Sequence, residues 1–207
     1  MIKKPNPSVL IVVAHPDDEI LWCGGTILSH PEWACFVVSV CRGGDVDRSR
    51  RFYEVLALLH VKGAMADLND DPQQSPLNLD ELKKTILSLV PDKPFDLILT
   101  HHPKGEYTRH LRHEEVSKAA VHLWNTEQIS SPELWTFAFE DGTRAFYPGP
   151  MENADILVNL ETQVWDQKYQ LLTQTYGFGT ESWEAMACPK SEAFFKYQKN
   201  PLPENHF

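Results

Sequence analysis

The stretch Val9-Leu10-Ile11-Val12-Val13-Ala14-His15-Pro16-Asp17-Asp18-Glu19 decides the fold class of this chain. Its first half is a continuous apolar run rich in β-branched residues, which is typical of a parallel strand buried on both faces. Its second half places one imidazole and three carboxylates directly after that run. Because ligands of open α/β sheets bind at the carboxyl ends of the strands, the stretch predicts a buried first strand that ends in a polar site.

Apolar runs and segments with helical periodicity alternate over about the first 125 residues. The i, i+3, i+7 spacing of Phe52, Val55 and Leu59, for example, predicts a helix at 47–60. In chain order, strands are expected at 9–14, 33–41, 95–100, 134–139 and 156–160, helices at 18–29, 47–60, 79–89, 116–123 and 161–176, and loops at 70–76 and 147–152. This alternation predicts an α/β fold, a Rossmann-like three-layer sandwich with a mostly parallel sheet and helices on both faces.

The composition fits a single globular domain over residues 1–207. The chain has 207 residues, of which 42% are apolar and 23% charged, and its formal net charge is −10. Because such an acidic chain repels phosphate backbones, nucleic acid is not expected as a partner. No apolar stretch approaches the ~18 residues of a membrane-spanning helix, so no membrane partner is expected either.

The cysteines and the N-terminus favour a cytoplasmic protein. Cys23, Cys35, Cys41 and Cys188 form no Cys-x-x-Cys pair, and we expect them to be reduced and mostly buried. The basic start Met1-Ile2-Lys3-Lys4 and the apolar run at 9–14 imitate a signal peptide. That run is too short, however, and it ends in charged residues rather than in a small-residue cleavage site.

The first motif, His15-Pro16-Asp17-Asp18-Glu19, has two interpretations. Like charges grouped at a strand end cost free energy unless a cation or hydrogen bonds compensate them, and imidazole and carboxylate are both good zinc ligands. In the other interpretation, Asp17 and Asp18 occupy the N-cap and first turn of the following helix, where the helix dipole favours acidic residues.

The second motif follows the strand at 95–100 and holds four histidines within 13 residues: His101, His102, His110 and His113. Two histidines and one aspartate on a cation leave a position for water, whose pKa the cation lowers towards ~7. A second carboxylate beside it can act as general base. Non-haem iron(II) oxygenases use the same ligand types, so the spacing by itself fixes neither the metal nor the reaction.

Over roughly residues 8–125, the two motifs in this order resemble the PIG-L / LmbE-like family of N-deacetylases. The resemblance implies a Rossmann-like fold, a bound zinc ion, with Fe2+ as an alternative, and deacetylation of a compound containing N-acetylglucosamine. It implies His15, Asp18 and His113 as metal ligands, Asp17 as the general base, and His110 as the residue that steadies the oxyanion or helps the leaving amine.

This chain departs from the resemblance in the second motif. Many family members carry His-Pro-Asp-His there, whereas this chain has His110-Leu111-Arg112-His113 and keeps only the outer histidines. His101 is a candidate for orienting a metal ligand from behind.

Three further residues are candidates for binding substrate. Arg51 matches an arginine that often faces substrate in relatives, and the alternative is a surface pair with Glu54. Tyr107 can donate its hydroxyl to an oxyanion or simply pack in a loop. Asp45 can bind sugar hydroxyls or cap the following helix.

The sequence therefore predicts a zinc-dependent N-deacetylase that acts on a small soluble amide or amino sugar and that can form a homo-oligomer. Two alternatives concern its chemistry, namely an amidase that cleaves a thiol or sugar conjugate and a non-haem iron(II) enzyme, which would be expected to have a β-rich fold. A third is a binding module without catalysis, against which the presence of Asp17 beside the three candidate ligands argues.

Overall fold

The apolar run near the start of the chain forms the central strand of the sheet. In the computed structural model, which describes residues 6–73, 75–108 and 110–199, β1 (Ser8–Val13) lies between β2 (Ala34–Cys41) and β4 (Leu97–Thr100) and is parallel to both. Alternate residues of the run face opposite cores. Val9, Ile11 and Val13 belong to one buried cluster, and Leu10, Val12 and Ala14 belong to the other. The run is continuously apolar because both of its faces are covered.

The sheet has seven strands in the order β3-β2-β1-β4-β5-β9-β8. The remaining strands are β3 (Lys62–Leu68), β5 (Glu133–Phe137), β8 (Ile156–Asn159) and β9 (Ser191–Gln198). Strands β3 to β5 in this order are parallel, and β9 runs antiparallel to both of its neighbours. The chain proceeds outward from β1 to β3 and then crosses to β4 on the other side. The carboxyl ends of β1 and β4 therefore form a topological switch point, where α/β sheets bind ligands.

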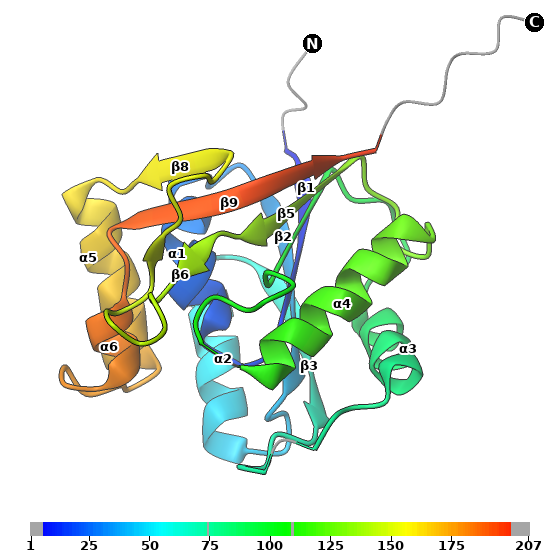
Figure 1. Ribbon diagram of the computed structural model, residues 1–207, viewed down its shortest axis with the longest axis horizontal. Coiled ribbons are helices and arrows are strands. Elements are labelled where there is room, and N and C mark those ends of the chain that lie inside the picture. Colours follow the sequence, from blue (N-terminus) through cyan, green and yellow to red (C-terminus); the bar gives the residue numbers. More distant parts are fainter. Residues whose placement is uncertain (1–5, 74, 109, 200–207) are drawn as a thin grey trace, which may run out of the picture.

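Helices cover both faces of this sheet (Figure 1). One layer contains α1 (Asp18–Ser29), α2 (Val46–Leu58), α5 (Thr162–Gln170), its π-helical continuation at Leu171–Thr175, and the short α6 (Trp183–Ala187). The other layer contains α3 (Leu79–Leu89) and α4 (Leu111–Asn125). The two buried clusters lie between these layers and the sheet. The predicted three-layer α/β fold with a mostly parallel sheet is confirmed.

Several elements differ from the sequence-based expectation. The strands β3 and β9 were not expected, because β3 is half-exposed and contains Gly63, and β9 carries charged residues along its length. A two-stranded ladder pairs Phe139–Glu140 (β6) with Gly149–Pro150 (β7), so part of the loop expected at 147–152 is a strand. The helix expected at 116–123 begins earlier, at Leu111. Residues 1–5, which entered the comparison with a signal peptide, lie outside the described residues.

The helices do not include a membrane span: none within the described residues combines the length and apolarity that crossing a bilayer requires.

A buried ion pair joins the C-terminal elements to the first helix. Nζ of Lys168 lies 2.7 Å from Oε1 of Glu192, and both side chains are fully buried. The same carboxylate accepts hydrogen bonds from the backbone of Gly25 and from the backbone and hydroxyl of Thr26 on α1. One carboxylate thus holds α5, β9 and α1 together, because all of its acceptor capacity is used inside the protein.

We expect Lys168→Ala to lower the free energy of unfolding by about 3 kcal/mol, because it leaves a buried carboxylate without its counter-charge. Glu54→Ala, which removes an exposed pair with Arg50 on α2, is the control and should change it very little. Urea unfolding followed by circular dichroism measures both. Equal midpoints for the two variants would show that the buried pair does not stabilise the fold.

Candidate active site

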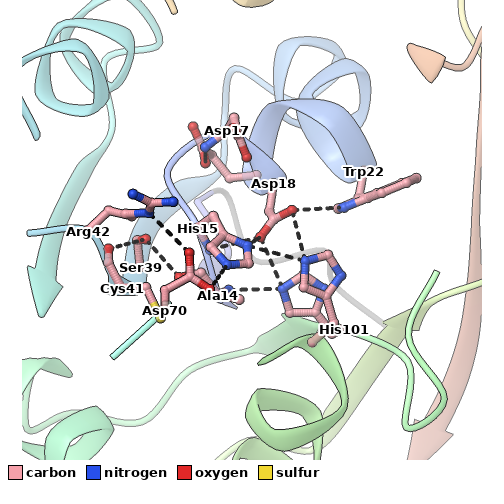
Figure 2. A network of polar contacts seen from close by, with 12 residues as sticks. Ala14, His15, Asp17, Asp18, Trp22, Ser39, Cys41, Arg42, Asp70 and His101 are labelled. Atoms are coloured by element: carbon pink, nitrogen blue, oxygen red, sulfur yellow. Dashed lines mark hydrogen bonds and ion pairs between the residues drawn. The ribbon is translucent and has the colours of Figure 1, made fainter. Parts of the chain in front are cut away.

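The two predicted motifs meet at the switch point. His15, Asp17 and Asp18 lie in the turn from β1 into α1, and His101 follows β4 directly. His113 lies in the first turn of α4 and is 1% exposed, so it faces the protein interior rather than solvent. Figure 2 shows His15 at the centre of this network, with Asp18 and His101 on one side and Asp70 on the other. Residues almost a hundred positions apart thereby share one site.

Three side chains converge at distances suited to a single cation. Nδ1 of His15 lies 3.2 Å from Oδ2 of Asp18, Nε2 of His113 lies 3.4 Å from Oδ1 of Asp18, and the two ring nitrogens are 3.3 Å apart. Zinc bonded to nitrogen or oxygen at about 2.0–2.1 Å in a tetrahedral arrangement separates its ligand atoms by about 3.3 Å. The two histidines face different oxygens of Asp18, Oδ2 and Oδ1. Donor atoms within 4.8 Å of one another come from His15, His110 and His113, and from Asp18, His101 and His113, so this cluster has donors of the kind that bind a divalent cation.

Asp18 is anchored on both of its oxygens. Oδ1 accepts a hydrogen bond from Nε1 of Trp22 at 3.2 Å, and Oδ2 accepts one from the backbone N–H of His15 at 2.8 Å. Burial alone would raise the pKa of Asp18, but the nearby rings of His113 and His101 hold it well below its ordinary value. The carboxylate is therefore charged and held in place as a ligand should be.

His113 is oriented by Glu106, a fully buried residue. Oε2 of Glu106 accepts hydrogen bonds from Nδ1 of His113 at 2.5 Å and from Nδ1 of His101 at 3.0 Å, and Oε1 accepts one from the backbone N–H of His102. These donors outweigh the effect of burial and lower the pKa of Glu106 to about 2. Burial lowers the pKa of His113, but Asp18 and Glu106 outweigh burial and raise it. When the ring is neutral, the hydrogen bond to Glu106 keeps its proton on Nδ1 and leaves the lone pair of Nε2 to the site.

His101 lies between Asp18 and Glu106, with its Nε2 3.4 Å from Oδ2 of Asp18. Its Nε2 accepts a hydrogen bond from the backbone N–H of Ala14 at 2.9 Å, so its proton lies on Nδ1 and is donated to Glu106. The ring stacks on His113 with the centroids 3.9 Å apart. The orienting role of His101 stays a prediction, because this residue also forms a possible cation-binding group with Asp18 and His113.

His15 lies between two carboxylates. Its Nδ1 faces Asp18, and its Nε2 lies 3.2 Å from Oδ1 of Asp70. The other oxygen of Asp70, Oδ2, pairs with Nε of Arg42 at 3.0 Å. Burial would lower the pKa of His15, but the bonds to Asp18 and Asp70 raise it to about 9. The two carboxylates beside this ring therefore stabilise positive charge, whether that charge is a proton on the ring or a cation bound to Nδ1.

Asp17 stands beside this cluster in a strained conformation, with φ at 140°. Its backbone N–H donates to Oε2 of Glu19 at 3.0 Å, and its Oδ2 accepts a hydrogen bond from Nη1 of Arg48 at 2.9 Å. Its side chain makes no helix-capping hydrogen bond. Burial and the charge of Asp18 raise the pKa of Asp17 to about 7, although Arg48 opposes the shift. A carboxyl group that titrates near neutrality is suited to proton transfer.

The C-terminal segment holds Asp17 in place through Glu19. The hydroxyl of Tyr176 donates to Oε1 of Glu19, and both side chains are buried. Nη1 of Arg51 donates to the carbonyl oxygen of Thr175 at 3.1 Å and fixes the same segment to α2. Strained backbone persists only where its surroundings over-determine it, and this pair of contacts supplies that constraint.

His110 borders the cluster at the N-cap position of α4. Its ring centroid lies 4.1 Å from that of His113 and 4.8 Å from that of His15. Burial and these two rings lower its pKa to about 3, so it is neutral. Its buried Nδ1 has no hydrogen-bond partner among the described residues, and one of its ring nitrogens lies within 4.8 Å of those of His15 and His113. An orphaned nitrogen beside a converging donor set also fits a site built for a cation.

The three candidate substrate-binding residues take different positions. Tyr107 lies at the cluster, with its ring centroid 5.5 Å from those of His110 and His113. Asp45 caps α2 by accepting from the backbone of Asp47 and Arg48. Arg51 donates to Asp47 and to Thr175, and it is Arg48 that reaches Asp17. Substrate-binding roles for Arg51, Tyr107 and Asp45 stay predictions.

The departure from His-Pro-Asp-His has a structural counterpart in Arg112, whose side chain is fully buried. Its guanidinium donates to the carbonyl oxygens of Asn69 and Ser75 and to Glu115. These contacts fix the loop after β3 to α4, and that loop carries Asp70. Arg112 therefore positions the loop from which Asp70 contacts His15.

A family model described as PIG-L, GlcNAc-PI de-N-acetylase, matches residues 10–124, more than half of the chain. This chain belongs to the PIG-L family. The matched region contains the three candidate ligands, Asp17 and Glu106. The C-terminal part of this PIG-L chain, with Tyr176 and strand β9, lies beyond it.

Individual relatives are distant. An uncharacterized protein, L374, of Acanthamoeba polyphaga mimivirus is 29% identical over 148 residues, which are 65% of this chain and 63% of the viral protein, so the match spans less than two thirds of that relative. An N,N'-diacetylchitobiose deacetylase from Pyrococcus horikoshii has a TM-score of 0.70 and 18% identity, covering 93% of this chain and 84% of its own. GalB, the 4-carboxy-2-hydroxymuconate hydratase of Pseudomonas putida, has a TM-score of 0.65 and 17% identity, covering 96% and 99%. These structures share the fold of this PIG-L chain.

Four residues of the PIG-L site were missed by the sequence analysis: Arg48, Asp70, Glu106 and Tyr176. A carboxylate seven residues before His113 is a weak signal for Glu106, since buried histidines that bind metals need an acceptor for their second nitrogen. Arg48 lies one helical turn before Arg51 on the same face of α2, so the helical periodicity does not show which of the two reaches Asp17. Asp70 follows β3 and Tyr176 follows the π-helical segment, and only the tertiary fold places them near the two motifs.

We expect Glu106→Gln to weaken Zn2+ binding by about 10–100-fold, because the amide lacks the negative charge that both rings face and its NH2 group would oppose either the ring N–H groups or the backbone N–H of His102. Calorimetric titration of the metal-free protein with Zn2+ measures the affinity. Glu114→Gln, a change in the groove on the outer side of α4, is the control. Unchanged affinity in Glu106→Gln would show that Glu106 does not orient His113.

Proposed function

We propose that this chain is a divalent-metal-dependent hydrolase, most simply a zinc enzyme, that removes an acetyl group from the nitrogen of a small N-acetylated amino sugar. The observation that carries the proposal is the position of Asp17. Its carboxyl group, with a pKa of about 7, stands beside three converging ligand side chains, His15, Asp18 and His113. A proton acceptor next to a cation site is the arrangement that water activation requires.

His15, Asp18 and His113 would hold the cation. When bound, it would polarise the amide carbonyl and lower the pKa of a water molecule. Asp17 would then take a proton from the attacking water and later give it to the departing amine, so that the amide C–N bond breaks and acetate and a free amine form. Arg48 holds the carboxyl group of Asp17 through a 2.9 Å hydrogen bond to its Oδ2.

His110 would stabilise the negative oxygen that develops on the carbonyl. Because its pKa is lowered to about 3, it is neutral near pH 7 and serves as a hydrogen-bond donor rather than as an acid. Tyr107, whose pKa is raised by burial, keeps its hydroxyl proton and can donate from the same side. Protonation of the amine therefore falls to Asp17, which titrates near neutrality.

The family assignment supports an amide substrate, whereas the fold by itself does not. A hydratase and several deacetylases share this architecture, so the reaction must be argued from the site. The α/β fold does not match the β-rich architecture expected of the iron(II) oxygenase alternative. The amidase alternative, with a thiol or sugar conjugate as substrate, uses the same residues and differs only in the acyl group. Four buried cysteines without a disulfide support a reducing, cytoplasmic setting.

We expect Asp17→Asn to lower kcat for acetate release from N-acetylglucosamine conjugates by about 10²–10⁴-fold while the protein still binds Zn2+, because the amide cannot accept the proton. Acetate release with added Zn2+ measures the rate, and calorimetric titration measures the metal affinity. Asp92→Asn, in an exposed loop away from the site, is the matched control.

His113→Ala should lose both metal affinity and turnover, since it removes a ligand. Near-normal turnover in Asp17→Asn would contradict the assignment of the base. Normal Zn2+ affinity in His113→Ala would contradict the assignment of the ligand set.

A further inference from the structure

A cavity of about 730 Å³ opens beside the active site. Its wall contains His110 and Tyr107 on the side of the cluster, and Arg144, Phe146 and Trp183 on the far side. The family match ends at residue 124, so the far wall belongs to the part of the chain that this match does not describe. The cavity therefore joins the site, through His110 and Tyr107, to residues that lie beyond the family match.

Aromatic contacts link the cluster to the cavity. The ring centroid of Tyr107 lies 5.5 Å from that of His113 and 4.7 Å from that of Trp183. Trp183 also contacts Trp22, whose indole donates to Asp18. A molecule whose acetamide group reaches the cluster would thus place its next part against these rings.

The far wall is a loop held in an unusual conformation. Gly142, Thr143 and Arg144 have consecutive positive φ angles of 55°, 62° and 69°. A Cβ at Gly142 would lie 2.3 Å from the ring of Phe146, so only glycine permits this packing. Strained loops of this kind cluster where a protein positions groups for a ligand.

Asp141 fixes this loop to the active site. Its carboxylate accepts hydrogen bonds from the backbone N–H of Thr108 at 2.9 Å, from the hydroxyl of Thr108 at 2.6 Å and from the backbone N–H of Thr143 at 3.1 Å. The carboxylate of Asp141 is therefore bonded to donors of Thr108 and of the loop itself. Because Thr108 lies two residues before His110, the loop and the catalytic side of the cavity are tied together.

Arg144 is presented without a counter-charge. Arg144 is exposed, and its backbone N–H donates to the carboxylate of Asp141, while its guanidinium makes no ion pair, hydrogen bond or ring contact with another described residue. It adjoins the half-exposed rings of Phe146 and Tyr147 in the same wall. An unpaired planar cation beside flat apolar rings is suited to a ligand that has both an apolar face and an anionic group.

We propose that this cavity binds the part of the substrate attached to the acetylated sugar, that this part is an aryl or similarly flat apolar group carrying an anionic substituent, and that Arg144 is the specificity-determining residue. The inference rests on the proposed deacetylation, because it assigns the substrate class of that same site. Phe146 and Trp183 supply the apolar surface, and Arg144 supplies the charge that receives a carboxylate or phosphate.

The test compares methyl, phenyl and 4-carboxyphenyl glycosides of N-acetylglucosamine as substrates of the zinc-loaded protein. We expect kcat/KM for acetate release to rise from methyl to phenyl, and to rise again by about tenfold to a hundredfold for carboxyphenyl. Arg144→Gln should remove the advantage of carboxyphenyl over phenyl, and Phe146→Ala should reduce that of phenyl over methyl. Arg50→Gln, which removes an exposed arginine on α2, should leave both ratios as in the wild type.

Calorimetric binding of the matching free-amine glycosides separates this inference from the proposed function, because it needs no turnover. Acetate release without a preference for carboxyphenyl, or a preference that survives in Arg144→Gln, overturns the inference and leaves the deacetylase standing. Absence of acetate release from all three compounds overturns the deacetylase. In that case, an Arg144-dependent preference in binding still supports the subsite, and equal binding of the three amines removes it as well.

Discussion

The buried carboxylate of Asp18 is the interaction on which the site depends. It stands at the first position of α1, is 4% exposed, and receives hydrogen bonds from a backbone N–H and an indole N–H. A charge this deep is stable only if donors or cations surround it. Three histidine rings converge on it within 3.4 Å, and each ring is held from behind by a carboxylate. The arrangement of the whole switch point follows from compensating this one charge.

Each of the supporting carboxylates contacts a different residue of the site. Glu106 sets the proton of His113 on Nδ1, and Asp70 faces the second nitrogen of His15. Glu19 holds the backbone of Asp17 at a conformation that an L-residue rarely adopts. Burial and the charge of Asp18 raise the pKa of Asp17 to about 7, whereas the histidine rings around Asp18 hold the pKa of that carboxyl group well below its ordinary value. Neighbouring acids in one short motif thus acquire different roles from their surroundings.

Residues 125–199, which lie beyond the family match, complete the site without contributing a candidate ligand. The carboxylate of Glu192 joins α5 and β9 to α1, and Tyr176 and Arg51 fix the segment that supports Glu19. The loop at 141–148 and the start of α6 form the far wall of the cavity. A family whose matched region ends before these elements can therefore keep one chemistry while the C-terminal part changes what the cavity accepts.

The sequence by itself determined the buried central strand, the alternation of strands and helices, and the polar groups that each strand delivers to the sheet edge. Those features are local, since a run of apolar residues such as 9–14 is readable without knowing its neighbours. Only the tertiary structure decided that Glu106 rather than solvent receives the second nitrogen of His113, that Arg48 rather than Arg51 meets Asp17, and that Arg144 borders the cavity. Each of these three contacts depends on how a helix is placed or on the path of a loop. Contacts between residues far apart in the chain determine that placement, and local periodicity does not.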